Sequence, residues 1–247
     1  MFDAANEFEF WGRQAVDHAL FAQLALEVPA LKVAAGQLHD QMAQTYANRD
    51  RVAFLPLLQQ SIDFKRQALA QQRAGEWIGW AFPSFIQHMI DEENFALARI
   101  QGQEFTPQAL IDFWNGERAG ETAVTAHLID PSAPAATARA ADASLKFARL
   151  TRSRQATPAT IAAARALAAQ VNQELLSWNP PAQPLSIISQ EIRDHVAREG
   201  QRFVDTTNLL LRDVQIAPPP PGAVVAPPQP LRPIDIARAL GRGRFGR

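Results

Sequence analysis

Two histidine–glutamate pairs occur at the same spacing in this sequence. His88 is followed by Glu92 and His195 by Glu199, four residues later in each case. Positions four residues apart lie on one face of a helix, so each pair can present an imidazole nitrogen and a carboxylate oxygen together. One such pair is also common on helix surfaces, where it has no metal. Two pairs among only five histidines indicate a metal site.

The two pairs fall at matching places in a chain that repeats itself. Phe10-Trp11 recurs as Phe113-Trp114, an offset of 103 residues, and "HMIDEENF" from His88 recurs as "HVAREGQR" from His195, an offset of 107 residues. Seven residues after the two tryptophans stand His18 and Glu121. We interpret this as a tandem duplication, with repeats at 1–103 and 104–213 and a tail at 214–247.

The matched positions predict a set of metal ligands. If the first, fourth, fifth and eighth helices pack together, six side chains can converge, and helix bundles commonly build metal sites in this way. Imidazole and carboxylate ligands suit iron or manganese, and also accept zinc. The six predicted ligands are His18, His88, Glu92, Glu121, His195 and Glu199.

The sequence leaves the layout of these ligands open. They can form one shared site with one or two metal ions, or one site per repeat, in which His18 joins His88 and Glu92 while Glu121 joins the other pair. Glu93 and Glu191 are alternative ligands, and Asp17 and Asp194 can hydrogen-bond to a ligand. His39 and His127 lack a matching partner, so we expect them at the surface or beside a ligand.

Helical periodicity runs through almost the whole chain, and no stretch alternates as a strand does. The sequence therefore predicts an all-α, up-down helix bundle of about eight helices. Trp11 and Trp114 should pack in the core on the ligand face, closing one end of the site. The expected helices span 4–26, 29–48, 51–74, 83–101, 107–129, 133–153, 157–178 and 184–212.

Composition excludes several classes of site and partner. The chain has no cysteine, which rules out disulfides, thiolate metal sites and cysteine nucleophiles. Its formal net charge is -1, so nucleic acid is not an expected partner. The first residues do not resemble a signal peptide, and no apolar run is long enough to span a bilayer. We expect a cytoplasmic protein without membrane contact.

The end of the chain has a different composition. Residues 217–230 are rich in proline, which disfavours helix and strand and predicts an extended connector. Residues 231–247 offer a short amphipathic helix near 233–240 and an arginine-rich end. Such a tail is typical of a docking peptide, so residues 217–247 are a candidate site for a protein partner or for self-association.

At four stretches the chain resembles a little-characterised bacterial family of tandem, ferritin-like helical proteins. The stretches are "FWGRQAVDHALF", "FIQHMIDEENFAL", "FWNGERAGETAVTAHLIDP" and "LSIISQEIRDHVAREGQRF". The resemblance implies a duplicated bundle with internal iron or manganese. Two departures stand out: Asp91 lies where the second repeat has Arg198, and Glu121 replaces the family histidine. The spacing of known di-iron carboxylate proteins, Glu-x-x-His, is absent here.

Three functions compete on this basis. The first is a non-haem metal protein with oxidase, oxygen-handling or peroxide-handling chemistry. The second is a scaffold or cargo protein that acts through its tail, with a structural bundle. The third is a purely structural bundle whose histidine–glutamate pairs lie on the surface.

Overall fold

The chain folds into eight α-helices, as the computed structural model shows for residues 2–77, 79–130, 132–152, 155–177 and 190–216. No strand element occurs in these described ranges. The all-α prediction is confirmed, and none of the described helices is long and apolar enough to cross a membrane. The helices are α1 (Ala4–Ala25), α2 (Pro29–Ala47), α3 (Arg51–Arg73), α4 (Pro83–Ile100), α5 (Pro107–Leu128), α6 (Pro134–Thr151), α7 (Pro158–Ser177) and α8 (Gln190–Ile216).

Local capping explains where most helices begin. Five helices start on proline, whose fixed φ suits the first helical position and whose missing N–H is not needed there. Asp3, Asp50 and Thr106 accept a hydrogen bond from a backbone N–H of the first turn, at 2.8, 2.9 and 3.2 Å. These signals are visible in the sequence, and seven predicted helices match within two residues at each end.

The eighth helix differs from its prediction. It continues to Ile216, four residues beyond the expected end at Arg212. Residues 213–216 contain no proline or glycine, and the first helix-breaking residue is Pro218. The expected start near 184 and the tail at 217–247 lie outside the described residues, so the tail and its partner stay predictions.

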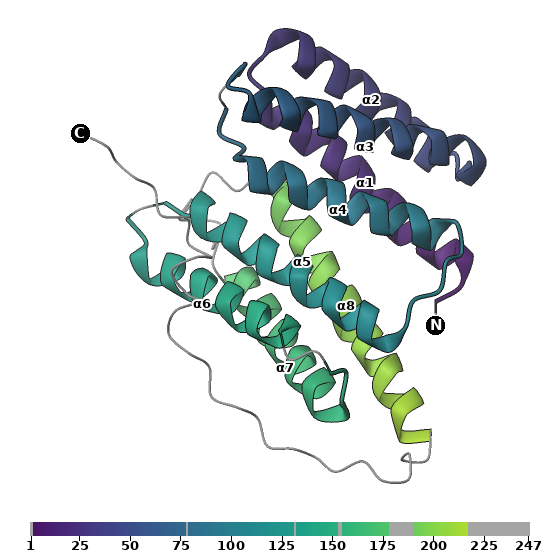
Figure 1. Cartoon of the computed structure of the whole chain (residues 1–247), viewed down its shortest axis with the longest axis vertical. Helices are drawn as coiled ribbons and strands as arrows, with labels where there is room; N and C mark the ends of the chain where they lie inside the picture. Colours follow the sequence, from purple (N-terminus) through teal and green to yellow (C-terminus); the bar gives the residue numbers. More distant parts are fainter. Residues whose placement is uncertain (1, 78, 131, 153–154, 178–189, 217–247) are drawn as a thin grey trace.

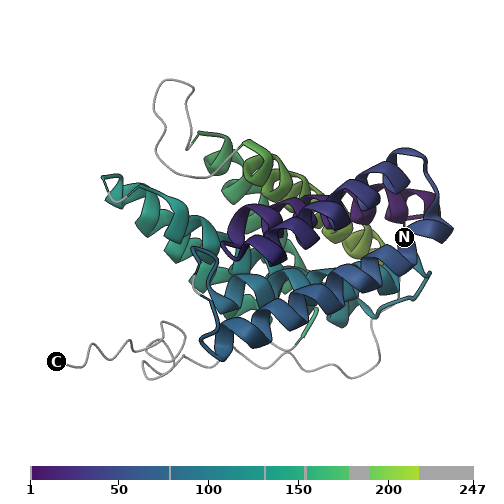
Figure 2. The ribbon, with the colours of Figure 1, turned by 90° about the horizontal axis from the view of Figure 1, so that it is seen from above.

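Four helices form the middle of the molecule. Helix α1 contacts α4 and α8, and α5 contacts the same two helices, so α1, α4, α5 and α8 make a closed ring. Helices α2 and α3 pack on one side of this ring, and α6 and α7 on the other (Figures 1 and 2). The first and last helices of each predicted repeat therefore meet in the interior, as the ligand prediction requires. The repeat boundaries themselves stay a prediction.

Aromatic side chains fill one end of the ring. Trp11 and Trp114 are both buried and stack on each other with ring centroids 5.5 Å apart. Trp114 also stacks on Phe203 at 5.6 Å, and Phe95 on Phe113 at 3.5 Å. This packing excludes water from that end, in agreement with the core role expected for the two tryptophans.

Candidate metal centre

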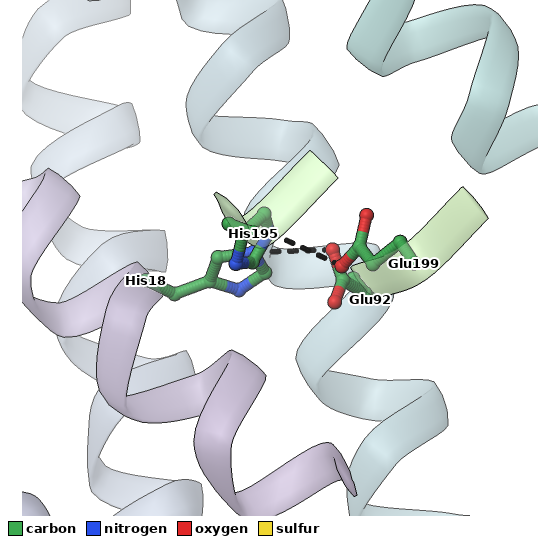
Figure 3. Close-up of side chains that lie close together, drawn as sticks. All are labelled: His18, Glu92, His195 and Glu199. Carbon is green, nitrogen blue, oxygen red and sulfur yellow. Dashed lines mark ion pairs between the residues drawn. The ribbon is translucent and has the colours of Figure 1, made fainter. Parts of the chain in front are cut away.

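Four predicted ligands meet between the central helices. His18 from α1, Glu92 from α4, and His195 and Glu199 from α8 each offer a ligand atom, and these atoms all lie within 4.8 Å of one another. Figure 3 shows the two imidazoles and the two carboxylates turned toward one another. Their side chains are 2%, 2%, 5% and 1% exposed. We call these four residues the inner group.

A second group shares Glu92 with the first. His88 from α4 and Glu117 from α5 join Glu92 in a set of three possible ligands that meets the same distance limit. His88 Nδ1 lies 3.1 Å from Glu117 Oε2, and His88 Nε2 lies 4.0 Å from Glu92 Oε2. We call His88, Glu92 and Glu117 the outer group. Because Glu92 belongs to both groups, its carboxylate stands between two possible ion positions.

Two of the close contacts within the groups are not hydrogen bonds. His18 Nε2 lies 3.1 Å from Glu92 Oε2, the same distance as from His88 Nδ1 to Glu117 Oε2. Yet both oxygens of Glu92 and Oε2 of Glu117 are buried without a hydrogen-bond partner among the described residues. Two atoms that each bind one ion at about 2.1 Å, at right angles, stand about 3 Å apart. The spacing and orientation therefore fit ligands aimed at a common ion.

Glu121 lies beside the two groups and belongs to neither. Arg118 Nη1 donates to Glu121 Oε2 at 2.6 Å, which occupies one oxygen, while Oε1 is buried without a hydrogen-bond partner in the described chain. Glu121 lines a small cavity together with His18, His88 and His195. It thus faces the cluster, but the structure does not place it among the grouped ligand atoms.

Residues around the groups hold the inner ligands in place. Asp17 Oδ2 lies 3.4 Å from His195 Nδ1, so the other nitrogen, Nε2, faces Glu199 Oε1 at 3.1 Å. Gln14 Nε2 donates to Glu199 Oε1 at 2.5 Å. A carboxylate on the far nitrogen of a metal-binding histidine fixes the ring and its tautomer. Asp17 therefore makes the kind of contact with a candidate ligand that the sequence suggested.

Another buried pair lies beside His18. Lys65 Nζ donates to Glu93 Oε1 at 2.7 Å, and Ser61 Oγ donates to the same oxygen at 3.0 Å. That oxygen lies 3.8 Å from His18 Nδ1, too far for a direct hydrogen bond. Glu93 was an alternative ligand in the sequence, but here its charge is committed to Lys65.

Burial governs the protonation of the acidic side chains. Burial raises the pKa of Glu92 to about 7, although Glu199 and His195 act in the opposite direction. Burial, followed by neighbouring carboxylates, raises the pKa of Glu117 well above the usual range. Burial also raises the pKa of Glu121 well above the usual range, although Arg118 acts in the opposite direction. Without a cation, these carboxyls therefore tend to keep protons.

The histidines divide into two kinds. Burial lowers the pKa of His18 well below its usual value and that of His88 to about 3, and His195 adds to both shifts. Burial also acts to lower the pKa of His195, but Glu199, Asp17 and Glu92 outweigh it and hold that pKa well above its usual value. His18 and His88 are thus neutral, which is the form that binds a metal.

The remaining sequence candidates lie away from the groups. His127 is exposed, and His39 pairs with the exposed Asp40 at 3.1 Å, as expected for residues outside the site. Glu191 and Asp194 are exposed on α8. The possible ligand groups do not follow the layout with one site per repeat, because His18 from the first half is grouped with His195 and Glu199 from the second.

Glu117 is the grouped residue that sequence reasoning missed. It stands four residues before Glu121, so two carboxylates occupy one face of α5. That spacing is visible in the sequence, but the histidine–glutamate spacing that marks the other ligands is absent there, because the single histidine of α5 is the exposed His127. In the predicted repeat, Glu117 matches Gln14, whose amide is not a typical metal ligand.

The comparisons with known proteins support the fold. No family model matches the chain. Uncharacterized protein L567 of Acanthamoeba polyphaga mimivirus is 27% identical over 157 residues, covering 53% of this chain and 49% of that protein. The chain thus matches about half the length of this relative. The crystal structure of an uncharacterized protein from Bacillus cereus G9241 superposes with a TM-score of 0.76 at 16% identity, covering 83% of this chain and 90% of that one.

Fold and site together define the class: a helical bundle with buried histidine and glutamate groups that could hold a metal ion. More particularly, the described residues form eight helices, and two groups of possible ligands share Glu92 between α1, α4, α5 and α8. The resemblance to the tandem ferritin-like family stays a prediction.

Proposed function

We propose that this chain is a non-haem metal protein whose bundle holds a dinuclear centre of iron or manganese. The inner ion would take His18, His195 and Glu199, the outer ion would take His88 and Glu117, and Glu92 would bridge them. The observation that carries the proposal is Glu92: it is buried, it belongs to both groups, and neither of its oxygens has a hydrogen-bond partner in the described chain. A buried carboxyl group without partners is costly unless something else satisfies it.

The donor set supports this choice of metals. Three imidazoles and three carboxylates offer nitrogen and hard oxygen ligands without sulfur, which suits iron and manganese. Zinc accepts the same ligands but has no redox chemistry. When bound, two such redox-active ions would supply Lewis acidity and one-electron steps for oxygen or peroxide chemistry. The outer group offers only three protein residues, which leaves positions open for a small ligand.

Several residues of the chain would serve that chemistry directly. Asp17 would hold His195 in the orientation that binds an ion through Nε2. Glu121 can hold a proton beside the cluster, because burial and the neighbouring Glu199 raise its pKa well above the usual range. The stacked Trp11 and Trp114 would keep one end of the site dry.

Elemental analysis of anaerobically purified protein tests the proposal. We expect two equivalents of iron or manganese per chain in the wild type. His88→Ala should remove the outer equivalent and His195→Ala the inner one, while His127→Ala, a change of the same kind at an exposed site, should keep both. Full metal content in the double variant His88→Ala/His195→Ala would contradict the assigned ligands. Oxygen uptake after loading with Fe²⁺ would then test the chemistry.

A further inference from the structure

In the predicted duplication, the centre has two matching flanks, one between α1 and α8 and one between α4 and α5. Hydrogen bonds between side chains close the α1–α8 flank. On the α1–α8 flank, Arg198 Nε donates to Gln14 Oε1 at 3.1 Å, and the guanidinium also pairs with Asp17. Gln14 in turn donates to Glu199, and Asp17 bonds to His195. These three side chains tie both helices together over the inner ligands.

The matching positions on the α4–α5 flank carry different residues. With the offsets of the repeat, Gln14 corresponds to Glu117, Asp17 to Gly120, and Arg198 to Asp91. Gly120 has no side chain, and Asp91 accepts a hydrogen bond from Gln87 of its own helix at 2.9 Å. Glu117 turns inward to His88. The three-residue contact that joins α1 and α8 therefore has no equivalent between α4 and α5.

A surface hollow lies at this open flank. Its lining includes Arg73, Gln87, His88, Asp91, Gly116 and Glu117. Two of these residues, His88 and Glu117, belong to the outer group. Their side chains are 11% and 8% exposed, which is more than any side chain of the inner group. The outer position thus borders the hollow, whereas the inner position lies behind it.

We propose that this hollow is the port by which a divalent cation reaches the centre, with Asp91 as the first carboxylate that it meets. This inference rests on the proposed metal function. Asp91 is exposed at the rim, and Glu117 lies deeper in the same hollow. The exposed carboxylate of Asp91 would attract a cation, and the oxygens of Glu117 would replace part of its water shell. Glu92, shared by both groups, then leads to the inner position.

The rate of metal uptake tests the port. Co²⁺ is mixed with metal-free, full-length protein, and binding is followed by its visible absorption in a stopped-flow instrument. Asp91→Asn should slow uptake about threefold to tenfold at low salt, because it removes one attractive charge from the path. Final stoichiometry should stay at the wild-type value. Asp194→Asn is the matched control, since it removes the same charge from an exposed residue beside His195.

A second variant copies the closed flank. Asp91→Arg introduces an arginine at the open flank, where the closed flank has Arg198. We expect metal uptake to be slower in this variant than in Asp91→Asn. Equal rates of metal uptake in Asp91→Asn and Asp194→Asn would overturn the proposed port. A loss of bound ions in Asp91→Asn would also overturn it, because Asp91 would then be a ligand. A wild-type protein that takes up no Co²⁺, Mn²⁺ or Fe²⁺ would instead refute the proposed function itself.

Discussion

Gly120 controls the position of one candidate ligand. A Cβ atom at Gly120 would lie 2.7 Å from His88 Nδ1, closer than real Cβ contacts allow, whereas one at Gly116 would meet nothing within 4 Å. Both glycines lie on α5, one turn apart. The absence of a side chain at Gly120 therefore allows His88 to reach Glu117.

This pair of glycines gives a matched experiment. Gly116→Ala should stabilise the protein by about 0.5–1 kcal/mol, because alanine is the better helix former. Gly120→Ala should lose this gain and bind one ion fewer, since the methyl group pushes His88 away from Glu117. Urea unfolding and elemental analysis measure the two effects. Two ions bound to Gly120→Ala with wild-type affinity would show that His88 does not depend on this space.

Asp17 offers a second prediction at the same scale. Asp17→Asn keeps the size of the side chain but removes the charge next to His195 Nδ1. We expect the affinity of the inner ion to fall about 10-fold to 100-fold, as is usual when such a supporting carboxylate is lost. Competition with a chelator measures this affinity. Asp40→Asn is the control, because Asp40 also contacts a histidine, His39, but at the surface. An equal loss in both variants would contradict the assigned role.

Single residues also show where sequence reasoning works and where it stops. The His-x-x-x-Glu spacing identified Glu92 and Glu199 because helical geometry fixes which side chains share a face. The match to His18 predicts Glu121 as a ligand, yet Arg118 on the same helix binds one of its oxygens. Glu117, one turn earlier, takes the place beside His88. Side-chain competition of this kind depends on distances between helices, which spacing in one helix does not contain.

At the scale of elements, the helices were predictable and their pairing was only partly so. Proline starts and polar caps are local signals, so the sequence places most helix ends within two residues. The meeting of α1, α4, α5 and α8 followed from the assumed repeat and is confirmed. The sequence left open whether the two halves share a site, and the structure groups His18 of α1 with residues of α4 and α8.

The difference between the two flanks also belongs to this scale. Helices α1 and α8 are joined by Arg198, Asp17 and Gln14, whereas α4 and α5 face each other across a hollow that contains Asp91 and Glu117. A symmetric duplication predicts two equal flanks. At the positions that the predicted repeat matches, three residues differ, and with them one flank is closed and the other is open.

At the scale of the whole molecule, the buried carboxyls link stability to pH. The pKa of Glu92 is about 7, and those of Glu117, Glu121 and Glu199 are raised above the usual range. The pKa of His195 is also raised. The folded, metal-free chain therefore keeps protons that the unfolded chain releases, and its stability falls as pH rises through these values. Below about pH 6.5, His18 and His88 have the opposite effect on stability. Their pKa values are lowered, so the folded chain loses stability as the pH falls.

Urea unfolding of metal-free protein between pH 6.5 and pH 8.5 checks this sign. We expect the free energy of unfolding to decrease across the range, by up to about 1.4 kcal/mol per pH unit for each group that titrates. Saturating Mn²⁺ should reverse the trend, because the ion replaces the protons and binds more tightly as pH rises. Glu92→Gln should flatten the slope of the metal-free protein. A free energy of unfolding that is constant or increases from pH 6.5 to 8.5 would contradict this prediction. It would mean that the buried carboxyl groups are already ionised in the metal-free protein, so that metal binding would displace no protons from them.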